Sequence, residues 1–118
     1  MKKIKYGIIG AGTMAQEHIL NISLIDNAEV VALADPYEDS LNQCKEILKT
    51  NVLCFKNHLE MIEKNIVDVY LISSPNFTHT EILKDIIKTK KHILVEKPLC
   101  TNTKDCLEIK KLTKDYPS

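Results

Sequence analysis

The sequence predicts an α/β protein built on a doubly wound parallel sheet of about five strands, with helices on both faces and three layers in all. Strand-like and helix-like segments alternate five times along the 118 residues. The strand-like runs are almost continuously apolar, as expected for parallel strands that are buried on both faces. The first run breaks into closely spaced glycines, and a helix-like pattern follows it. Together these observations favour one domain of this class.

The first element is a strand over residues 4–9, followed by a turn at Gly10 and Gly12 and then a helix. A turn this tight needs a residue without a Cβ at Gly10, and close approach of a pyrophosphate needs another at Gly12. Ala15 holds the third small position, which lets the helix pack against the strand. The first N–H groups and the dipole of the helix then face an anion. The pattern predicts a phosphate-binding turn, provided that an acid follows about 20 residues later.

Such an acid follows the second strand, which covers residues 29–34 and ends in Asp35. Asp35 comes 20 residues after Ala15, where a carboxylate can accept hydrogen bonds from an adenosine ribose. We expect NAD rather than NADP, because no arginine follows Asp35 and its carboxylate would repel a 2′-phosphate. Like charges about 4 Å apart cost on the order of 1 to 4 kcal/mol. The alternative is that Asp35 only caps the next helix.

The remaining elements are predicted from their periodicity. Strands are expected over residues 52–55, 67–72 and 92–95, and helices over 13–25, 38–49, 58–63 and 103–115, with one more helix capped by Asn76 or Thr78. The apolar faces of four of these helices, in chain order, are Met14, His18, Ile22 and Ile25; Leu41, Cys44 and Leu48; Ile82, Leu83, Ile86 and Ile87; Leu107, Ile109 and Leu112. We interpret His18 as a packed or capping residue rather than a cofactor contact. His58 is expected to be a surface or capping residue.

Composition excludes several classes of partner. Lysine plus arginine and aspartate plus glutamate number 16 each, so no global field attracts nucleic acid or an anionic membrane. The basic cluster of Lys88, Lys90 and Lys91 lies at a predicted helix end, where cations complement the dipole. No apolar stretch approaches the roughly 20 residues that span a bilayer. Since the N-terminal apolar run is also too short for a signal peptide, we expect a cytoplasmic protein. The scattered cysteines show no metal-ligand spacing, so we expect free thiols rather than two disulfides, and no metal.

In parallel sheets of this kind ligands bind at the carboxyl ends of the strands. The polar segments that follow the strands therefore carry the functional information. Four short motifs occur there in order: Gly10-x-Gly12-x-x-Ala15-x-x-His18, Ala34-Asp35-Pro36, Ser74-Pro75-Asn76-x-x-His79-x-Glu81 and Glu96-Lys97-Pro98-Leu99.

With these motifs the chain resembles, over essentially its whole length, the amino-terminal domain of the glucose-fructose oxidoreductase, inositol dehydrogenase and rhizopine-catabolism (Gfo/Idh/MocA) family. The resemblance implies a Rossmann-type fold, a bound nicotinamide dinucleotide and a parent enzyme acting on sugars, polyols or related compounds. It places the cofactor contacts at Gly10, Gly12, Thr13 and Met14 for the pyrophosphate, Asp35 for the ribose, and Ser74, Pro75, Asn76 and His79 for the nicotinamide side.

Glu96 and Lys97 match the family's Glu-Lys-Pro motif, which lies beside the nicotinamide and the substrate. The resemblance makes Lys97 the candidate catalytic residue, because a cation there lowers the cost of a developing alkoxide. The alternatives are a surface ion pair between Glu96 and Lys97, and an exposed His79 in the first turn of its helix.

Family enzymes continue into a second α/β domain that supplies the substrate pocket, and the resemblance implies that this domain is missing here. We therefore expect the 118-residue chain to bind NAD(H) with little or no turnover, and to associate with itself through apolar surface near Pro98 and Leu99. A second hypothesis is a freestanding, non-catalytic module that binds or senses NAD(H). A flavodoxin-like flavin or phosphate binder is disfavoured, because Asp35 is placed to bind a ribose.

Overall fold

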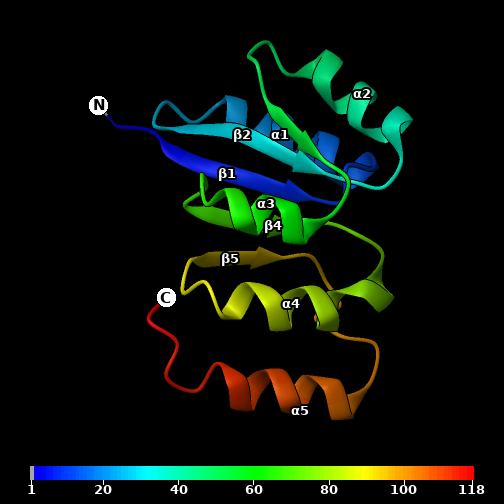
Figure 1. Ribbon diagram of the computed structural model, residues 1–118, viewed down its shortest axis with the longest axis vertical. Helices are drawn as coiled ribbons and strands as arrows, with labels where there is room; N and C mark the ends of the chain where they lie inside the picture. The colour runs from blue at the N-terminus through cyan, green and yellow to red at the C-terminus, as the bar shows by residue number, and fades with distance from the viewer. Residues whose placement is uncertain (1) are drawn as a thin grey trace.

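The computed structural model describes residues 2–118 and contains a five-stranded, fully parallel sheet (Figure 1). Its strands are β1 (Ile4–Ile9), β2 (Ala28–Ala34), β3 (Leu53–Phe55), β4 (Val69–Ile72) and β5 (His92–Val95). They lie side by side in the order β3-β2-β1-β4-β5. The chain therefore winds outward in one direction from β1, returns to its other side at β4 and winds outward again. This confirms the predicted Rossmann-type doubly wound sheet, with a switch point between β1 and β4.

Helices cover both faces of the sheet and complete the three predicted layers. They are α1 (Thr13–Ser23), α2 (Glu38–Ile47), α3 (His58–Lys64), α4 (His79–Ile87) and α5 (Thr103–Leu112), with a 3₁₀ turn η1 (Asn76–Thr78) before α4. Neighbouring β1 residues point to opposite faces: Ile8 packs with α1 and α2, whereas Ile9 packs with α3, α4 and α5. In Figure 1, α4 lies beside β5, and α5 lies beside α4.

The predicted apolar face of the first helix is right for Ile22 and wrong for Met14 and Ile25. Helix α1 ends at Ser23, and its buried residues are Ala15, Ile19 and Ile22. Met14 is 49% exposed and Ile25, beyond the helix, is 47% exposed. Two stripes of apolar residues run along this segment at helical spacing, and the stripe containing the small Ala15 is the one that packs on the sheet.

The last helix shows the same kind of difference. Helix α5 ends at Leu112 and buries Ile109, with Cys106 partly buried against the same core. Leu107 and Leu112, both predicted to face the core, are 59% and 48% exposed. The shorter Cys106 is one turn from Ile109, so these two residues define the face that packs into the same core as α4.

Candidate functional site

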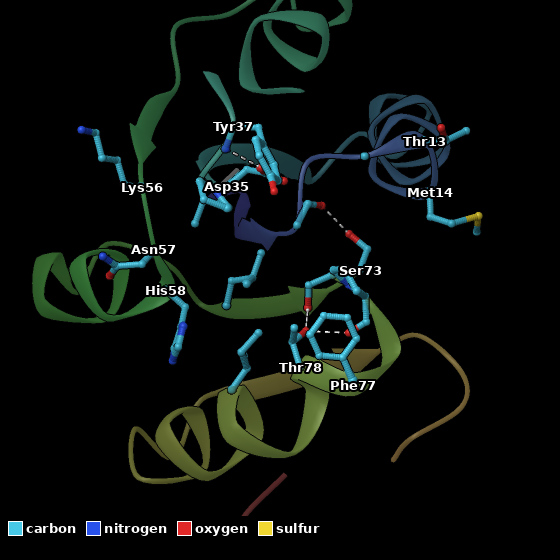
Figure 2. A pocket seen from close by; sticks show the side chains of 18 residues that line it. Thr13, Met14, Asp35, Tyr37, Lys56, Asn57, His58, Ser73, Phe77 and Thr78 are labelled. Atoms are coloured by element: carbon cyan, nitrogen blue, oxygen red, sulfur yellow. Dashed lines mark hydrogen bonds between the residues drawn. The ribbon is translucent and has the colours of Figure 1, made fainter. Parts of the chain in front are cut away.

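A cavity of about 690 Å³ opens at the carboxyl ends of the strands, where the strand order reverses. Residues from the turn after β1, from the segments after β2 and β3, and from the segment after β4 surround it (Figure 2). It is lined by Ile9, Gly10, Gly12, Thr13, Met14, Ala34, Asp35, Pro36, Tyr37, Lys56, Asn57, His58, Ser73, Ser74, Pro75, Phe77, Thr78 and Ile82. The fold thus brings together seven of the predicted cofactor contacts: Gly10, Gly12, Thr13, Met14, Asp35, Ser74 and Pro75.

Gly10 forms the tight part of the turn after β1. Its φ is +93°, and a Cβ at this position would lie 2.4 Å from the backbone nitrogen of Ser74. The Gly10 N–H donates to the Ala34 carbonyl at 2.8 Å, and the Ser73 hydroxyl donates to the Gly10 carbonyl at 2.8 Å. Both the backbone conformation and the close packing against the segment after β4 require glycine, as the sequence predicts.

Gly12 meets a different requirement. It is the N-cap residue of α1, and a Cβ built on it would have no atom of residues 2–118 within 4 Å. Packing of the described chain therefore does not demand glycine here, whereas close approach of a ligand to the protein backbone would. Gly12, Thr13 and Met14 are exposed, and the N-cap residue makes no side-chain hydrogen bond to the helix. The N–H groups of this first turn have no intrahelical acceptors, so they can bind phosphate oxygens.

Asp35 connects the turn to the end of β2. One carboxylate oxygen accepts from the Ala11 N–H at 2.8 Å and the other from the Tyr37 N–H at 2.8 Å. Tyr37 is the N-cap residue of α2, which has no side-chain cap bond, so Asp35 does not cap that helix in the usual way. Each carboxylate oxygen has a second acceptor site. Asp35 can therefore hold the turn and still accept from a hydroxyl in the cavity.

Cys44 of α2 supports the turn from beneath. The thiol is fully buried, and Sγ donates to the Ala11 carbonyl at 3.3 Å. Burial raises the pKa of the Cys44 thiol, and the negative charge of Asp35 raises it further. The neutral thiol is thus a fixed donor, and Ala11 is held through both its N–H and its carbonyl.

The segment after β4 forms the opposite side of the cavity. The hydroxyls of Ser74 and Thr78 are 2.7 Å apart, and Thr78 donates to the Pro75 carbonyl at 2.6 Å (Figure 2). Thr78, one of the two predicted caps, is the N-cap residue of α4, but its side chain caps no helical N–H, so the predicted capping bond is not formed. These bonds instead fix the shape of the cavity wall.

Two exposed aromatic side chains that were not predicted from the sequence also line the cavity. Tyr37, beside Asp35, is 72% exposed, and Phe77, beside Thr78, is 78% exposed (Figure 2). Lys56, directly after β3, adds a cation to the same lining. Tyr37, Lys56 and Phe77 each follow a strand within a few residues. Their position after the carboxyl ends of the strands was the sequence signal that could have identified them as cavity residues.

His58 is neither a cap nor a plain surface residue, contrary to the prediction. The N-cap residue of α3 is Asn57, whose side-chain oxygen accepts from the Glu60 N–H at 3.0 Å. His58 is half-buried in the cavity lining, and its Nε2 lies 2.7 Å from an Asp85 carboxylate oxygen. The pair joins the start of α3 to α4, a contact that local sequence could not indicate.

Four predicted contacts, Asn76, His79, Glu96 and Lys97, do not line the cavity. Asn76 and Lys97 are exposed beyond the strand ends. His79 is fully buried, so the alternative of an exposed His79 is wrong. Its Nδ1 lies 2.8 Å from the Pro98 carbonyl oxygen and its Nε2 3.0 Å from that of Ser74.

Glu96 does not pair with the lysine that follows it. Its carboxylate lies 3.6 Å from Nε2 of His18, which reaches across from α1. His18 is half-buried, which agrees with its interpretation as a packed residue. Within residues 2–118, the surface ion pair between Glu96 and Lys97 is therefore replaced by a contact with His18.

Two further features are absent from the part of the chain that the structure describes. No cluster of three or more His, Cys, Asp or Glu side chains there is arranged to hold a metal ion. None of its helices combines the length and the apolar character needed to cross a membrane.

Comparison with known proteins agrees with this geometry. The model of the Gfo/Idh/MocA family, described as an oxidoreductase family with an NAD-binding Rossmann fold, matches residues 4–117. Myo-inositol 2-dehydrogenase of Thermotoga maritima is 37% identical over 102 residues, which are 86% of this chain and 30% of that protein.

Solved structures share the fold. Myo-inositol dehydrogenase from Lactobacillus casei, in complex with NAD(H) and myo-inositol, gives a TM-score of 0.92 at 23% identity, over 98% of this chain and 34% of that one. A 3-ketoreductase from Actinomadura kijaniata, in complex with NADP, gives 0.82 at 22% identity, over 98% and 36%. The chain spans about a third of the length of these proteins. Since the family match covers nearly every residue and the glycine turn, Asp35 and the strand order agree with it, this chain belongs to the Gfo/Idh/MocA family of NAD-binding, Rossmann-fold oxidoreductases.

Proposed function

We propose that this chain is the NAD(H)-binding domain of an oxidoreductase that transfers hydride to or from a CH–OH group of a sugar, polyol or related compound. One observation carries the proposal: the open first turn of α1 and the carboxylate of Asp35 face the same cavity. An anion site and a hydroxyl acceptor side by side match the pyrophosphate and the ribose of a dinucleotide.

The remaining contacts follow the direction of the cavity. We assign the pyrophosphate to Gly10, Gly12, Thr13 and Met14, and the adenosine ribose to Asp35. The nicotinamide half then extends toward the segment after β4, where the assigned contacts are Ser74, Pro75 and Asn76, and toward Glu96 and Lys97 after β5.

The preference for NAD over NADP rests on how Asp35 is anchored. Two backbone N–H groups, each at 2.8 Å, hold its carboxylate, so it cannot swing away from a 2′-phosphate. Repulsion on the order of 1 to 4 kcal/mol corresponds to about tenfold or more in affinity. Lys56 in the same lining opposes this effect, and a relative binds NADP, so the ratio of the two affinities is the quantity to measure.

Lys97 follows β5 at the carboxyl end and is the proposed catalytic residue. A bound nicotinamide supplies hydride acceptance, and oxidation of an alcohol also requires loss of the hydroxyl proton. The Lys97 ammonium can donate a hydrogen bond to the substrate oxygen and stabilise the developing alkoxide.

Binding without appreciable turnover is expected of this chain by itself. Lys97 is exposed and does not line the cavity, so no described residue excludes water from it or fixes a substrate against it. Positioning and exclusion of water supply much of the rate in such reactions. A robust polyol dehydrogenase rate from the pure chain would refute this part of the proposal. The hypothesis of a freestanding NAD(H)-binding module shares the binding step and stays a prediction.

Calorimetric titration with NADH and NADPH tests the assignment of the ribose. We expect the chain to bind NADH more tightly, and Asp35→Asn to lower the NADH-to-NADPH affinity ratio. Asparagine keeps only one acceptor oxygen for the two N–H groups, so it can disturb the turn and weaken the binding of both cofactors. The ratio of the two affinities cancels that general loss. Asp115→Asn, an exposed carboxylate far along the sequence, is the matched control. Equal affinities for the two cofactors in the unsubstituted chain would exclude the ribose role of Asp35.

A further inference from the structure

We propose that His79 is a positioning residue that ties the segment carrying Lys97 to the wall of the cofactor cavity, rather than a contact to the nicotinamide. This inference rests on the proposed function, and it replaces the nicotinamide contact that the sequence predicts for His79. His79 is the first residue of α4 and is fully buried. Because it does not line the cavity, any effect on a cofactor must pass through the atoms that it holds.

The ring contacts backbone carbonyls on both sides. Nδ1 lies 2.8 Å from the Pro98 oxygen and 3.3 Å from the Leu99 oxygen, while Nε2 lies 3.0 Å from the Ser74 oxygen. Carbonyl oxygens only accept, so the imidazole must supply every proton in these bonds. A neutral ring has one N–H and can bond one segment at a time, whereas the doubly protonated ring bonds both.

These two segments follow adjacent strands of the sheet, β4 and β5. The ladder between β4 and β5 pairs Ile72 with Val95, and the Glu96 N–H donates to the Ile72 carbonyl at 2.9 Å. In Figure 1 the chain leaving β5 passes the start of α4, and there His79 reaches the Pro98 carbonyl.

Lys97 lies between two anchored neighbours as a result. On one side, Glu96 is fixed by its backbone bond to β4 and approached by His18 at 3.6 Å. On the other side, the Pro98 carbonyl is held by His79. The Lys97 side chain is exposed and free to reach a substrate, whereas its backbone position is set from both sides.

The contact between His79 and Ser74 extends to the glycine turn. Ser74 lines the cavity, and its backbone nitrogen lies so close to Gly10 that a Cβ there would be 2.4 Å away. A ligand that displaces the turn or Ser74 would therefore also displace the Ser74 carbonyl that contacts the His79 ring. His79 thus connects the cofactor-binding wall to the position of Lys97.

Amide NMR of the ¹⁵N-labelled chain tests this inference with two complementary variants. The amide of His79→Asn reaches about as far as Nδ1 and can keep the bond to Pro98, whereas that of His79→Gln reaches about as far as Nε2 and can keep the bond to Ser74. Without any cofactor, we expect the Gln variant to shift the Lys97 and Leu99 amides and the Asn variant to shift the Ser74 amide. His92→Gln, at the opposite end of β5, is the matched control.

Addition of NADH then tests the coupling. In the unsubstituted chain we expect shifts at Gly10 and Gly12 and also at Lys97 and Leu99. Both variants should keep the first pair of shifts and lose the second. Core packing alone would disturb both segments equally in the two variants, and that result, or an unchanged Lys97 response, overturns the inference.

The proposed function fails separately from this inference. If NADH shifts neither Gly10 nor Gly12 in the unsubstituted chain, the assignment of the cofactor site is wrong. The shifts of the two variants without cofactor still decide whether His79 holds the two segments. A variant pair with identical amide patterns would reject that role whatever the cofactor does.

Discussion

Alanine at Gly10 and alanine at Gly12 should separate folding from cofactor binding, although the two glycines are two residues apart. At Gly10, φ is +93° and the new Cβ would lie 2.4 Å from one backbone atom of Ser74 and 2.5 Å from another. The left-handed conformation costs about 1 to 3 kcal/mol in a residue with a Cβ. Relief of the overlap requires a backbone shift that costs about 1 to 3 kcal/mol more.

The expected loss for Gly10→Ala is therefore about 2 to 6 kcal/mol, a large part of the 5 to 15 kcal/mol that stabilises a typical domain. For Gly12→Ala, the Cβ meets no atom of the described residues, so the free energy of unfolding should change by less than about 1 kcal/mol. This Cβ would instead point to where the pyrophosphate is proposed to lie, and NADH affinity should fall at least tenfold, or about 1.4 kcal/mol.

Urea denaturation followed by circular dichroism measures the first effect, and titration of NADH fluorescence measures the second. The reasoning about the turn is refuted if Gly10→Ala unfolds at the same urea concentration as the unsubstituted chain. The pyrophosphate assignment is refuted if Gly12→Ala binds NADH normally. Each variant is the control for the other, because both add one methyl group to the same turn.

Further predictions concern titration, thiol reactivity and association. Burial raises the pKa of the Cys44 thiol and of the Tyr70 phenol, so the folded chain holds these protons more tightly than the unfolded chain. Their stabilisation is complete below the unfolded pKa values and is lost as pH rises, so the Tm should fall from about pH 8.5 upward. A thiol reagent should label the exposed Cys54 well before the buried Cys44, and equal labelling rates would contradict the packing beneath the turn. Leu94 and Leu99 are 48% and 38% exposed, so Leu94→Lys should reduce self-association in sedimentation, and a strictly monomeric unsubstituted chain would contradict the expectation.

The sheet and the location of the site could be predicted from the sequence because both depend on local patterns. Continuous apolar runs mark buried parallel strands, and polar residues just after them gather at one edge wherever the strands are parallel. Asp35 and Gly10 were found in this way, and the structure places both at the cavity.

Contacts between distant segments could not be predicted in this way. The carbonyls that surround His79 belong in part to Pro98, 19 residues away, and the partner of His58 is Asp85, 27 residues away. The packed faces of α1 and α5 were missed for a related reason. Each helix has apolar residues on neighbouring stripes, and the position of the sheet decides which stripe is buried.

The double anchoring of Asp35 limits how cofactor preference can change in a lineage. Replacement of the acid to admit a 2′-phosphate would also remove the acceptors of the Ala11 and Tyr37 N–H groups. Ala11 is fully buried, and an unsatisfied buried N–H costs about 1 to 3 kcal/mol. A stabilising substitution elsewhere, or a new acceptor for Ala11, would offset this cost. A switch from NAD to NADP at this position therefore changes the stability of the glycine turn together with the preference for the cofactor.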